Sequence, residues 1–200
     1  MVISAIHAMR NNWKIIGLID ETLAEGQKRY GYEIRHESRW FSLDNFNCFI
    51  AIGDASVRER IAAKQYPFVN VIHPTVRTRT PFCKGTYFGE NCVVGNNSVV
   101  GNFSIINTGV ILEHDSSVGD FSHLCPGVVT GGRVHIGDRT TIGLNASIRD
   151  GVQIGNNCVI GMGSVVLKDV PNNTTGWGNP FTAPVCARGC ANWCDDSTAL

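Results

Sequence analysis

A histidine, an acidic neighbour and a distant glycine stand at a spacing that suits acyl transfer. His114 is followed directly by Asp115, and Gly132 follows His114 by three steps of six positions. A histidine can take a proton from an attacking nucleophile, and a carboxylate bonded to its second ring nitrogen fixes the tautomer and raises the basicity of the ring. The backbone N–H of a glycine can hold the oxyanion that forms on a carbonyl. We expect this chemistry if the fold sets Gly132 above His114, with Asp115 or alternatively Glu113 as the partner of the imidazole.

A six-residue repeat in the sequence would place residues three repeats apart, such as His114 and Gly132, next to each other. Apolar anchors recur at every sixth position from Phe88 to Val166, with Thr130 as the one exception, and Gly follows the anchor in nine of the fourteen cases. A helix repeats at about 3.6 residues and a simple strand at about 2, so this period predicts a parallel β-helix in which three hexads close one coil of about 18 residues. The pattern extends upstream and gives 16 hexads over residues 76–171.

Departures from the repeat gather around the same histidine. The positions that depart are Asn107, Glu113, Cys125, Thr130, Arg149 and Leu167. Four of these six lie between Asn107 and Thr130, and that window also holds His114 and His123. Breaks in an otherwise consistent pattern mark the place where function is expected.

Residues 1–75 lack the repeat and alternate between strand-like and helix-like segments. Such alternation is typical of a small α/β domain with a parallel sheet. The expected helices are Val2–Met9 and Ala55–Lys64, and the expected strands are Trp13–Ile19, Cys48–Ile52 and Phe68–Ile72. The β-helix then occupies residues 76–171, and residues 172–200 are expected to loop back over the last coil as a cap and tail.

Composition and charge exclude several classes of protein. The 200 residues carry 17 Lys+Arg and 17 Asp+Glu, so no cationic excess is available to neutralise the phosphates of a nucleic acid. The chain is 43 % apolar and is expected to be globular, and its apolar runs fall short of the roughly 18–20 residues of a membrane span. Met1 leads into an amphipathic stretch without the features of a signal peptide, so we expect a soluble, cytoplasmic protein. The terminal Cys186, Cys190 and Cys194 lack the C-x2-C spacing of common zinc sites, so no metal is expected.

Several motifs resemble one family in order along the chain. They are FIAIGD, VIHP, NTGVILEHDSSVGDFSHLCPG, GGRVHIGDRTTIGLNASI and WGNP. Together they resemble the bacterial sugar O-/N-acyltransferases, a hexapeptide-repeat family that includes sialic acid O-acetyltransferases and N-acetyltransferases of UDP- or dTDP-linked 4-amino-4,6-dideoxy sugars. The resemblance implies a homotrimer with a Rossmann-like domain for the nucleotide-sugar and a left-handed β-helix that binds acetyl-CoA in clefts between subunits.

The resemblance also implies roles for individual residues. His114 would be the general base, Asp115 would tune it, and the Gly132 amide would lie near the thioester carbonyl. The other residues with implied roles are His123, Leu144 and Met162 for acetyl-CoA and Asn107 for the acceptor sugar.

The start of the chain departs from the family pattern. Members begin with a strand and a glycine-rich loop, whereas MVISAIHAM matches the helix after that loop, so the first strand and its loop are missing from this sequence. Either the true start lies upstream, or the protein holds its sugar nucleotide with fewer residues. The sugar nucleotide would then be held by residues that follow two later strands, namely Asp20, Glu21 and Gly53.

The sequence therefore predicts an acetyl-CoA-dependent, metal-free N-acetyltransferase of a UDP- or dTDP-linked 4-amino-4,6-dideoxy sugar in surface polysaccharide biosynthesis. O-acetylation of sialic acid or a related sugar stays open, because one histidine base can serve both reactions. A non-catalytic β-helix scaffold would share the same fold. A carbonic-anhydrase-like metalloenzyme needs three histidines on one metal with a wide gap before a short one, and the gaps of 9 and 12 between His114, His123 and His135 do not fit that spacing.

Overall fold

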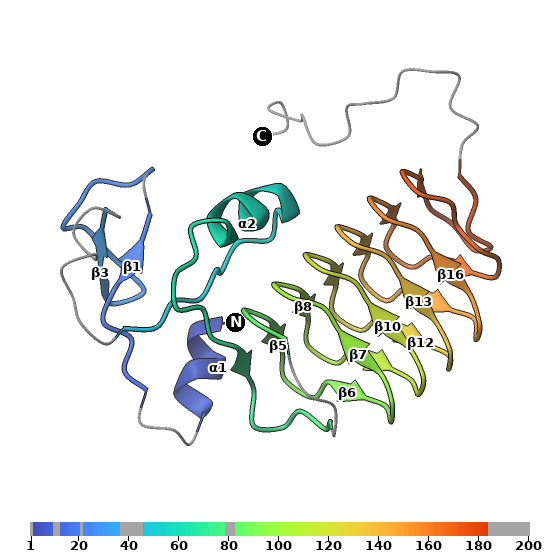
Figure 1. Cartoon of the computed structure of the whole chain (residues 1–200), viewed down its shortest axis with the longest axis horizontal. Helices are drawn as coiled ribbons and strands as arrows, with labels where there is room; N and C mark the ends of the chain where they lie inside the picture. The colour runs from blue at the N-terminus through green and yellow to red at the C-terminus, as the bar shows by residue number, and fades with distance from the viewer. Residues whose placement is uncertain (1, 10–12, 21, 37–45, 79–82, 184–200) are drawn as a thin grey trace.

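A solenoid of two-residue strands makes up about half of the chain (Figure 1). The computed structural model describes residues 2–9, 13–20, 22–36, 46–78 and 83–183. The solenoid strands are β5 (Tyr87–Phe88), β6 (Val93–Val94), β7 (Val99–Val100), β8 (Ile105–Ile106), β9 (Ile111–Leu112), β10 (Ser117–Val118), β11 (His123–Leu124), β12 (Val129–Thr130), β13 (His135–Ile136), β14 (Thr141–Ile142), β15 (Ser147–Ile148), β16 (Gln153–Ile154), β17 (Val159–Ile160), β18 (Val165–Val166) and β19 (Thr175–Gly176).

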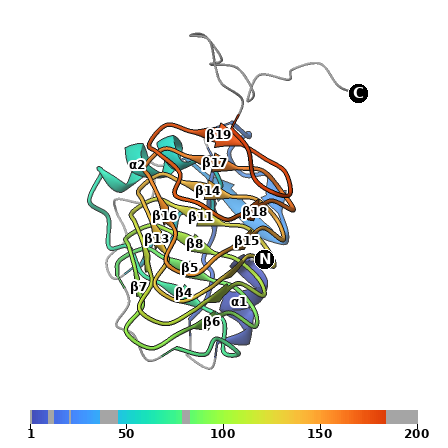
Figure 2. The same cartoon turned by 90° about the vertical axis from the view of Figure 1, so that its right-hand side faces the viewer.

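The coil of three hexads predicted from the repeat is confirmed by the strand register. Ser117 lies opposite Val99 on one side and His135 on the other, and each partner is three hexads away. In the described part of the chain the solenoid strands form a seven-stranded, a five-stranded and a four-stranded sheet, all parallel. The seven-stranded sheet runs from β4 (Val71–Ile72), which precedes the solenoid strands, to β19, and Figure 2 shows its strands stacked one above another. The parallel β-helix is therefore the observed architecture.

The anchors of the repeat fill the interior of this prism. Fully buried anchors include Phe88, Ile106, Leu112, Leu124, Ile142 and Ile160. The small residue four positions after an anchor satisfies the backbone at the corner, as Ser104 illustrates. Its hydroxyl donates to the Gly119 carbonyl at 2.7 Å and accepts from the Ser122 N–H at 3.0 Å. Since buried backbone groups must be paired, these hydroxyls complete the bonding that two-residue strands leave undone.

The N-terminal part contains both predicted helices. Its elements are α1 (Val2–Ala8), β1 (Leu18–Ile19), β2 (Lys28–Arg29), β3 (Tyr32–Arg35), α2 (Ala55–Ala62) and β4 (Val71–Ile72). α1 buries Ala5 in a cluster with Val71 and Tyr87, which fixes this helix against the edge of the solenoid. α2 begins at Asp54, whose carboxylate accepts from the Val57 N–H at 2.9 Å as an N-cap.

The sheet of the N-terminal part differs from the expected one in its hairpin, in the segment Cys48–Ile52 and in the place of β4, which joins a solenoid sheet. β2 and β3 form an antiparallel hairpin through Tyr30 and Gly31, whose φ values of 53° and 83° suit a tight two-residue turn. The expected strand Cys48–Ile52 is reduced to one bridge between Cys48 and Phe68. At the end of this segment, the carbonyls of Ile52 and Gly53 accept hydrogen bonds from the Arg58 guanidinium instead of pairing in a sheet.

β4 continues the seven-stranded sheet by pairing in parallel with β5. The last strand of the expected N-terminal region is therefore also the first rung of one solenoid wall.

At the far end, the chain turns back after β19. The Phe181 N–H bonds the Val165 carbonyl at 2.8 Å, and the Phe181 ring packs against the solenoid core. The cysteines 186, 190 and 194 lie outside the described residues. No helix in the described part of the chain is long and apolar enough to cross a membrane.

Candidate active site

His114 and Asp115 lie at the corner between the five-stranded and the four-stranded sheet, which we call the His114 corner (residues 113–116). The His114 Nδ1 lies 2.8 Å from the Asp115 Oδ2, and the Asn97 amide donates to the other carboxylate oxygen at 3.1 Å. These hydrogen bonds, first from His114 and then from Asn97, lower the pKa of Asp115, so the carboxylate is ionised at neutral pH. An ionised carboxylate accepts a hydrogen bond from Nδ1–H, and this leaves Nε2 as the ring nitrogen that can take a proton.

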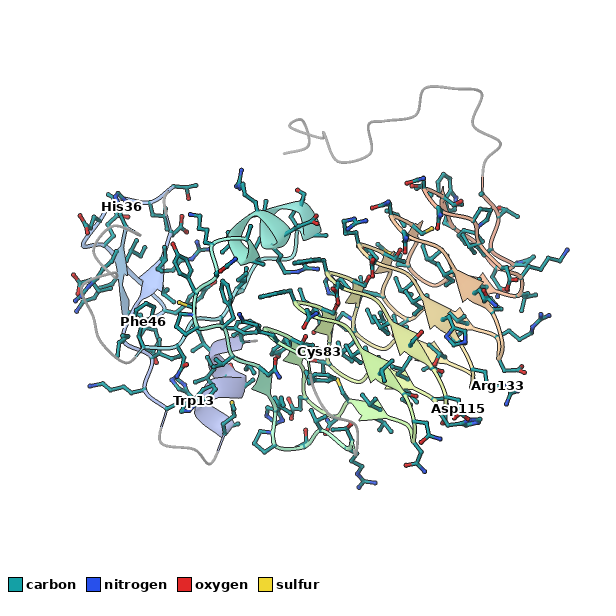
Figure 3. All side chains as sticks on the ribbon, in the orientation of Figure 1. Trp13, His36, Phe46, Cys83, Asp115 and Arg133 are labelled. Atoms are coloured by element: carbon teal, nitrogen blue, oxygen red, sulfur yellow. The ribbon has the colours of Figure 1, made fainter. Side chains whose placement is uncertain are left out.

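Gly132 lies directly against the His114 ring. A Cβ placed on Gly132 would be 2.6 Å from both Cε1 and Nε2 of His114. The two coils are joined beside this contact by the Arg133 N–H, which donates to the His114 carbonyl at 2.8 Å. The structure thus places His114 and Gly132 in contact, as their spacing of three hexads predicts. Figure 3 shows Asp115 and Arg133 on this edge of the solenoid, far from Trp13 and His36.

The N–H of Gly132 has no acceptor among the described residues. At the corner between the four-stranded and the seven-stranded sheet, the equivalent N–H groups are capped from the next coil. There the Asn102 N–H donates to Asp120 at 2.6 Å and the Asp120 N–H to Asp138 at 2.9 Å. Above Gly132 the corresponding residue is Asp150, whose carboxylate faces Arg133 at 3.4 Å instead. The Gly132 amide is left as a hydrogen-bond donor for a ligand.

Thr130, the one polar anchor, changes the backbone pairing next to His114. The Glu113 N–H donates to the Thr130 Oγ1 at 3.1 Å, whereas Gly95 and Gly101 donate to the main-chain carbonyls one coil on. β9 and β12 accordingly share only the Ile111–Val129 pair. The polar anchor therefore breaks the ladder at the residue that precedes the histidine.

Asn107 and His123 form a second polar pair. Asn107 Oδ1 accepts from the Thr108 N–H at 2.9 Å, so its NH2 group points to the His123 Nε2 at 3.3 Å. Burial, and then the charge of Arg58, lowers the pKa of His123 to about 4, so the ring is neutral at pH 7. A neutral ring that accepts at Nε2 carries its proton on Nδ1, and no described residue accepts from that N–H.

Cys125 lies beside the same imidazole. Its Sγ is 3.8 Å from the His123 Nε2. Burial raises the pKa of the Cys125 thiol, which therefore stays protonated at neutral pH. A protonated thiol is a poor nucleophile, so the geometry gives no support to an acyl-cysteine.

A cavity of about 140 Å³ opens beside Asn107 and His123. Its remaining lining consists of the apolar side chains and backbone of Val2, Phe49, Ile50, Ala51, Ile52, Gly53, Tyr87 and Ile105. The cavity therefore lies between the N-terminal part and the seven-stranded sheet, and its polar groups come from the solenoid. Gly53 is the one proposed sugar-nucleotide residue among its lining.

The remaining predicted residues lie elsewhere. Leu144 and Met162 are 44 % and 73 % exposed and stack one coil apart, at the corner between the seven-stranded and the five-stranded sheet. The Asp20 carboxylate accepts from the Thr22 N–H and hydroxyl at 2.9 and 2.6 Å and faces Arg29. These contacts stabilise a turn, and Asp20 is not among the residues that line the cavity. Glu21 lies outside the described residues.

The predicted site residues thus fall into two groups on opposite edges of the five-stranded sheet. His114, Asp115 and Gly132 lie on one edge, at the His114 corner. Toward the other edge, which adjoins the seven-stranded sheet, lie Asn107, His123, Leu144 and Met162. His123 follows His114 by nine residues, which is half a coil, so the two histidines face different sides of the prism.

Sequence reasoning missed Arg58 and the cavity wall that it holds. The signal in the sequence was a phenylalanine at the same turn position of two successive coils. Phe103 and Phe121 adopt left-handed backbone there, with φ of 53° and 58°. The other non-glycine residues in that conformation within the described solenoid are Asn, Asp or Arg. In the part of the chain that the structure describes, no group of three His, Cys, Asp or Glu side chains is arranged to hold a metal ion.

Comparisons with known proteins match both parts of the chain. The PglD N-terminal domain model matches residues 1–65, and the model called hexapeptide repeat of succinyl-transferase matches residues 133–168. No match is found among the curated proteins.

Solved structures match the two parts together. PerB from Caulobacter crescentus, in complex with CoA and GDP-perosamine, is 27 % identical with a TM-score of 0.82 over 91 % of this chain and 90 % of that chain. The acetyltransferase domain of PglB from Neisseria gonorrhoeae, in complex with acetyl coenzyme A, is 26 % identical with a TM-score of 0.83 over 91 % and 92 %. WeeI from Acinetobacter baumannii is 26 % identical with a TM-score of 0.78 over 84 % of each chain. The predicted left-handed β-helix with a small α/β region is confirmed by these likenesses.

Proposed function

We propose that this chain, a hexapeptide-repeat sugar acyltransferase with a PglD-type N-terminal domain, transfers the acetyl group of acetyl-CoA to the amino group of a nucleotide-linked sugar. The observation that carries the proposal is the His114–Asp115 pair packed against Gly132, whose N–H lacks an acceptor in the described chain. The CoA and nucleotide-sugar complexes of the similar structures support the choice of co-substrates. Acetyl-CoA serves as a co-substrate, and the residues above supply the chemistry without a metal.

The reaction needs one base and one oxyanion donor. The amine nitrogen attacks the thioester carbonyl carbon, and His114 Nε2 takes the proton that the nitrogen loses. The negative charge that develops on the carbonyl oxygen is held by the Gly132 N–H. When the C–S bond breaks, the amide has formed and the sulfur leaves with the electron pair, to be protonated by the imidazolium. Asp115 stabilises that imidazolium while the proton is in transit.

His123 and Asn107 are proposed to bind rather than to move the proton. The neutral His123 ring offers its Nδ1–H, which suits the carbonyl of acetyl-CoA, and the adjoining cavity suits part of the acceptor sugar. Leu144 and Met162 present exposed apolar surface one coil apart on the same edge, as the pantetheine arm requires. Asp20, Glu21 and Gly53 remain proposed contacts to the sugar nucleotide.

A complete site then needs two copies of the chain. The base lies on one edge of the five-stranded sheet and the binding residues lie on the other, so a second copy must supply the missing half. The outward residues of this sheet are small or apolar, namely Val93, Ile111, Val129, Ser147 and Val165. Such a face suits contact between identical subunits. We place the enzyme in a homotrimer, in the cytoplasm where acetyl-CoA is available.

The test is an acceptor panel with CoA release as the readout. UDP-, dTDP- and GDP-linked 4-amino-4,6-dideoxy sugars are compared with their 4-hydroxy counterparts and with sialic acid. Release of CoA with at least one amino sugar, and not with its hydroxyl counterpart, is expected. Release with sialic acid alone would establish the O-acetyltransferase instead, and binding of no acetyl-CoA by calorimetry would favour a non-catalytic scaffold.

A further inference from the structure

Arg58 is a buried cation that no part of the proposed chemistry uses. It belongs to α2, is 1 % exposed, and makes no ion pair in the described part of the chain. Burial lowers the pKa of Arg58 to about 10, so the guanidinium is still charged at neutral pH. The carboxylate of nearby Asp54 is occupied as the N-cap of the helix. A buried charge is stable only if hydrogen bonds replace its contacts with water, so the acceptors of the Arg58 guanidinium indicate its structural role.

All of those acceptors are backbone carbonyls, and they come from two parts of the chain. Nη1 donates to Ile52 at 3.1 Å and to Gly53 at 2.5 Å, which are residues of the N-terminal part. Nε donates to Phe103 at 2.9 Å, and Nη2 donates to Phe121. Phe103 and Phe121 are three hexads apart and occupy the same corner of two successive coils. One planar guanidinium therefore joins a loop to two rungs of the solenoid.

The two phenylalanines make that corner unusual. Left-handed backbone is unfavourable for a residue other than glycine, and aromatic residues seldom adopt it. Here the two rings stack with centroids 5.4 Å apart, and Phe68 packs on Phe103 edge-on at 5.2 Å. The strained turns are thus compensated by contact with the N-terminal part. Strain that is held in place by surrounding structure is a pointer to function.

The loop that Arg58 grips is one wall of the cavity beside Asn107 and His123. Ile52 and Gly53 line that cavity, together with Phe49 and Ile50. Ile52 is exposed and lacks a strand partner, so the bonds to Arg58 are what fix its carbonyl relative to the solenoid. Figure 1 shows α2 beside the loops of the first coils, on the edge of the solenoid that faces away from Asp115 in Figure 3.

We infer that Arg58 is a positioning residue of the sugar-nucleotide site: it sets the distance between the Ile52–Gly53 wall and the Asn107–His123 pair, and so determines how the acceptor is bound. This inference rests on the proposed function for its ligand. It does not place Arg58 in contact with either substrate. The acceptor site should depend on Arg58, because Arg58 holds the Ile52–Gly53 wall. The acetyl-CoA contacts should not, because His123 is held by strand pairing within the seven-stranded sheet and Leu144 and Met162 lie on the exposed edge.

The test compares Arg58→Met and Arg58→Lys with Arg60→Met, an exposed arginine in the last turn of the same helix. Steady-state kinetics gives separate KM values for the nucleotide-sugar and for acetyl-CoA. We expect Arg58→Met to raise the KM for the nucleotide-sugar by about tenfold or more and to change the KM for acetyl-CoA by less than about twofold. Arg58→Lys keeps the charge but cannot reach four carbonyls at once, so it should behave like Arg58→Met. Arg60→Met should match the wild type.

Hydrogen exchange supplies a readout that does not depend on activity. The Cys48 and Val69 amides donate to the Pro67 and Cys48 carbonyls, each at 3.0 Å, and these bonds hold the start of this loop. In folded Arg58→Met protein these two amides should exchange about tenfold faster or more, with those of coils beyond residue 140 unchanged. Equal increases in both KM values, or unchanged exchange at Cys48 and Val69, would overturn the inference, as would failure of both Arg58 variants to fold. If the wild type acetylates no nucleotide-sugar, the proposed function fails, and the exchange experiment still tests the anchoring.

Discussion

The chemistry proposed at the scale of single residues depends on where the His114 imidazole carries its proton. Its Nδ1 faces an ionised Asp115, and its Nε2 faces the bare side of Gly132. With 49 % of the side chain exposed, the ring can meet a substrate from solvent without a change in the coil. The proposed base and the proposed oxyanion donor thus lie on adjacent coils, where a tetrahedral centre could contact both.

Replacing His114 by alanine removes the base and leaves the backbone donor in place. We expect kcat to fall by roughly two to four powers of ten, which is what a positioned base is worth. His135→Ala is the matched control, because His135 is an exposed histidine one coil on whose ring meets the Ser117 hydroxyl. A fall of less than about threefold at saturating substrates would remove His114 from the proposed role.

The half-buried, neutral His123 should make the folded chain sensitive to acid. Its pKa is about 4 in the folded chain against 6.5 for the free side chain, so between these values the unfolded chain binds more protons and folding stability falls with falling pH. From pH 7 to pH 5 the free energy of unfolding of the wild type should drop by about 1–2 kcal/mol more than that of His123→Gln. Urea titrations at both pH values measure this, and parallel losses in the two proteins would contradict it.

At this scale the sequence predicts partners that share a column of the repeat. His114 and Gly132 can be paired because they are one coil apart and both lie where a regular pattern is interrupted. The Asn107–His123 contact is set by a side-chain amide orientation that depends on the Thr108 N–H, and such a detail has no periodic signal. Asp20 resembles a binding residue because it ends a strand, and its carboxylate caps its own turn.

At the scale of the element, the coil of three hexads determines which residues contact each other across the repeat. This contact allows a specific test at Gly132. An alanine there is not opposed by the backbone, but its Cβ would lie 2.6 Å from the His114 ring, which must move aside. We expect Gly132→Ala to lower kcat by about tenfold to a hundredfold, with a melting temperature close to that of the wild type.

The double variant distinguishes displacement of the ring from a general defect. When His114 is already alanine, the added Cβ has no imidazole to displace, so Gly132→Ala should have little further effect on the residual rate. Independent, multiplicative losses in the double variant would show that Gly132 does not act through His114.

Prediction of the elements is accurate where one signal dominates and fails where two compete. Sixteen hexads in phase predict the solenoid, because an unbroken period of six fits no other common element. The Cys48–Ile52 segment has strand composition, yet its carbonyls bond the Arg58 side chain, and this long-range contact leaves no mark in local sequence. The Tyr30–Gly31 turn is absent from the prediction, although glycine after a polar aromatic residue suits it.

At the scale of the whole molecule, the site is divided between two edges of the five-stranded sheet. The proposed base and the proposed binding residues lie half a coil apart, so in the proposed assembly one copy of the chain would contribute to two sites, each shared with a different neighbouring subunit. Sequence spacing contains this separation, since nine residues are half of a coil of three hexads, but which neighbour completes each half depends on packing between copies. A closed ring of three identical subunits would complete three equivalent sites.

Mixed assemblies of two inactive variants test this account most directly. His114→Ala lacks the base and His123→Ala lacks the opposite half-site, and each alone should release CoA at a small fraction of the wild-type rate. Co-expressed in equal amounts, random mixing joins an intact His114 to an intact His123 at about a quarter of the interfaces, so the mixture should regain about a quarter of the wild-type activity. Activity no higher than that of the separate variants, in assemblies shown to contain both chains, would contradict a site built from two copies.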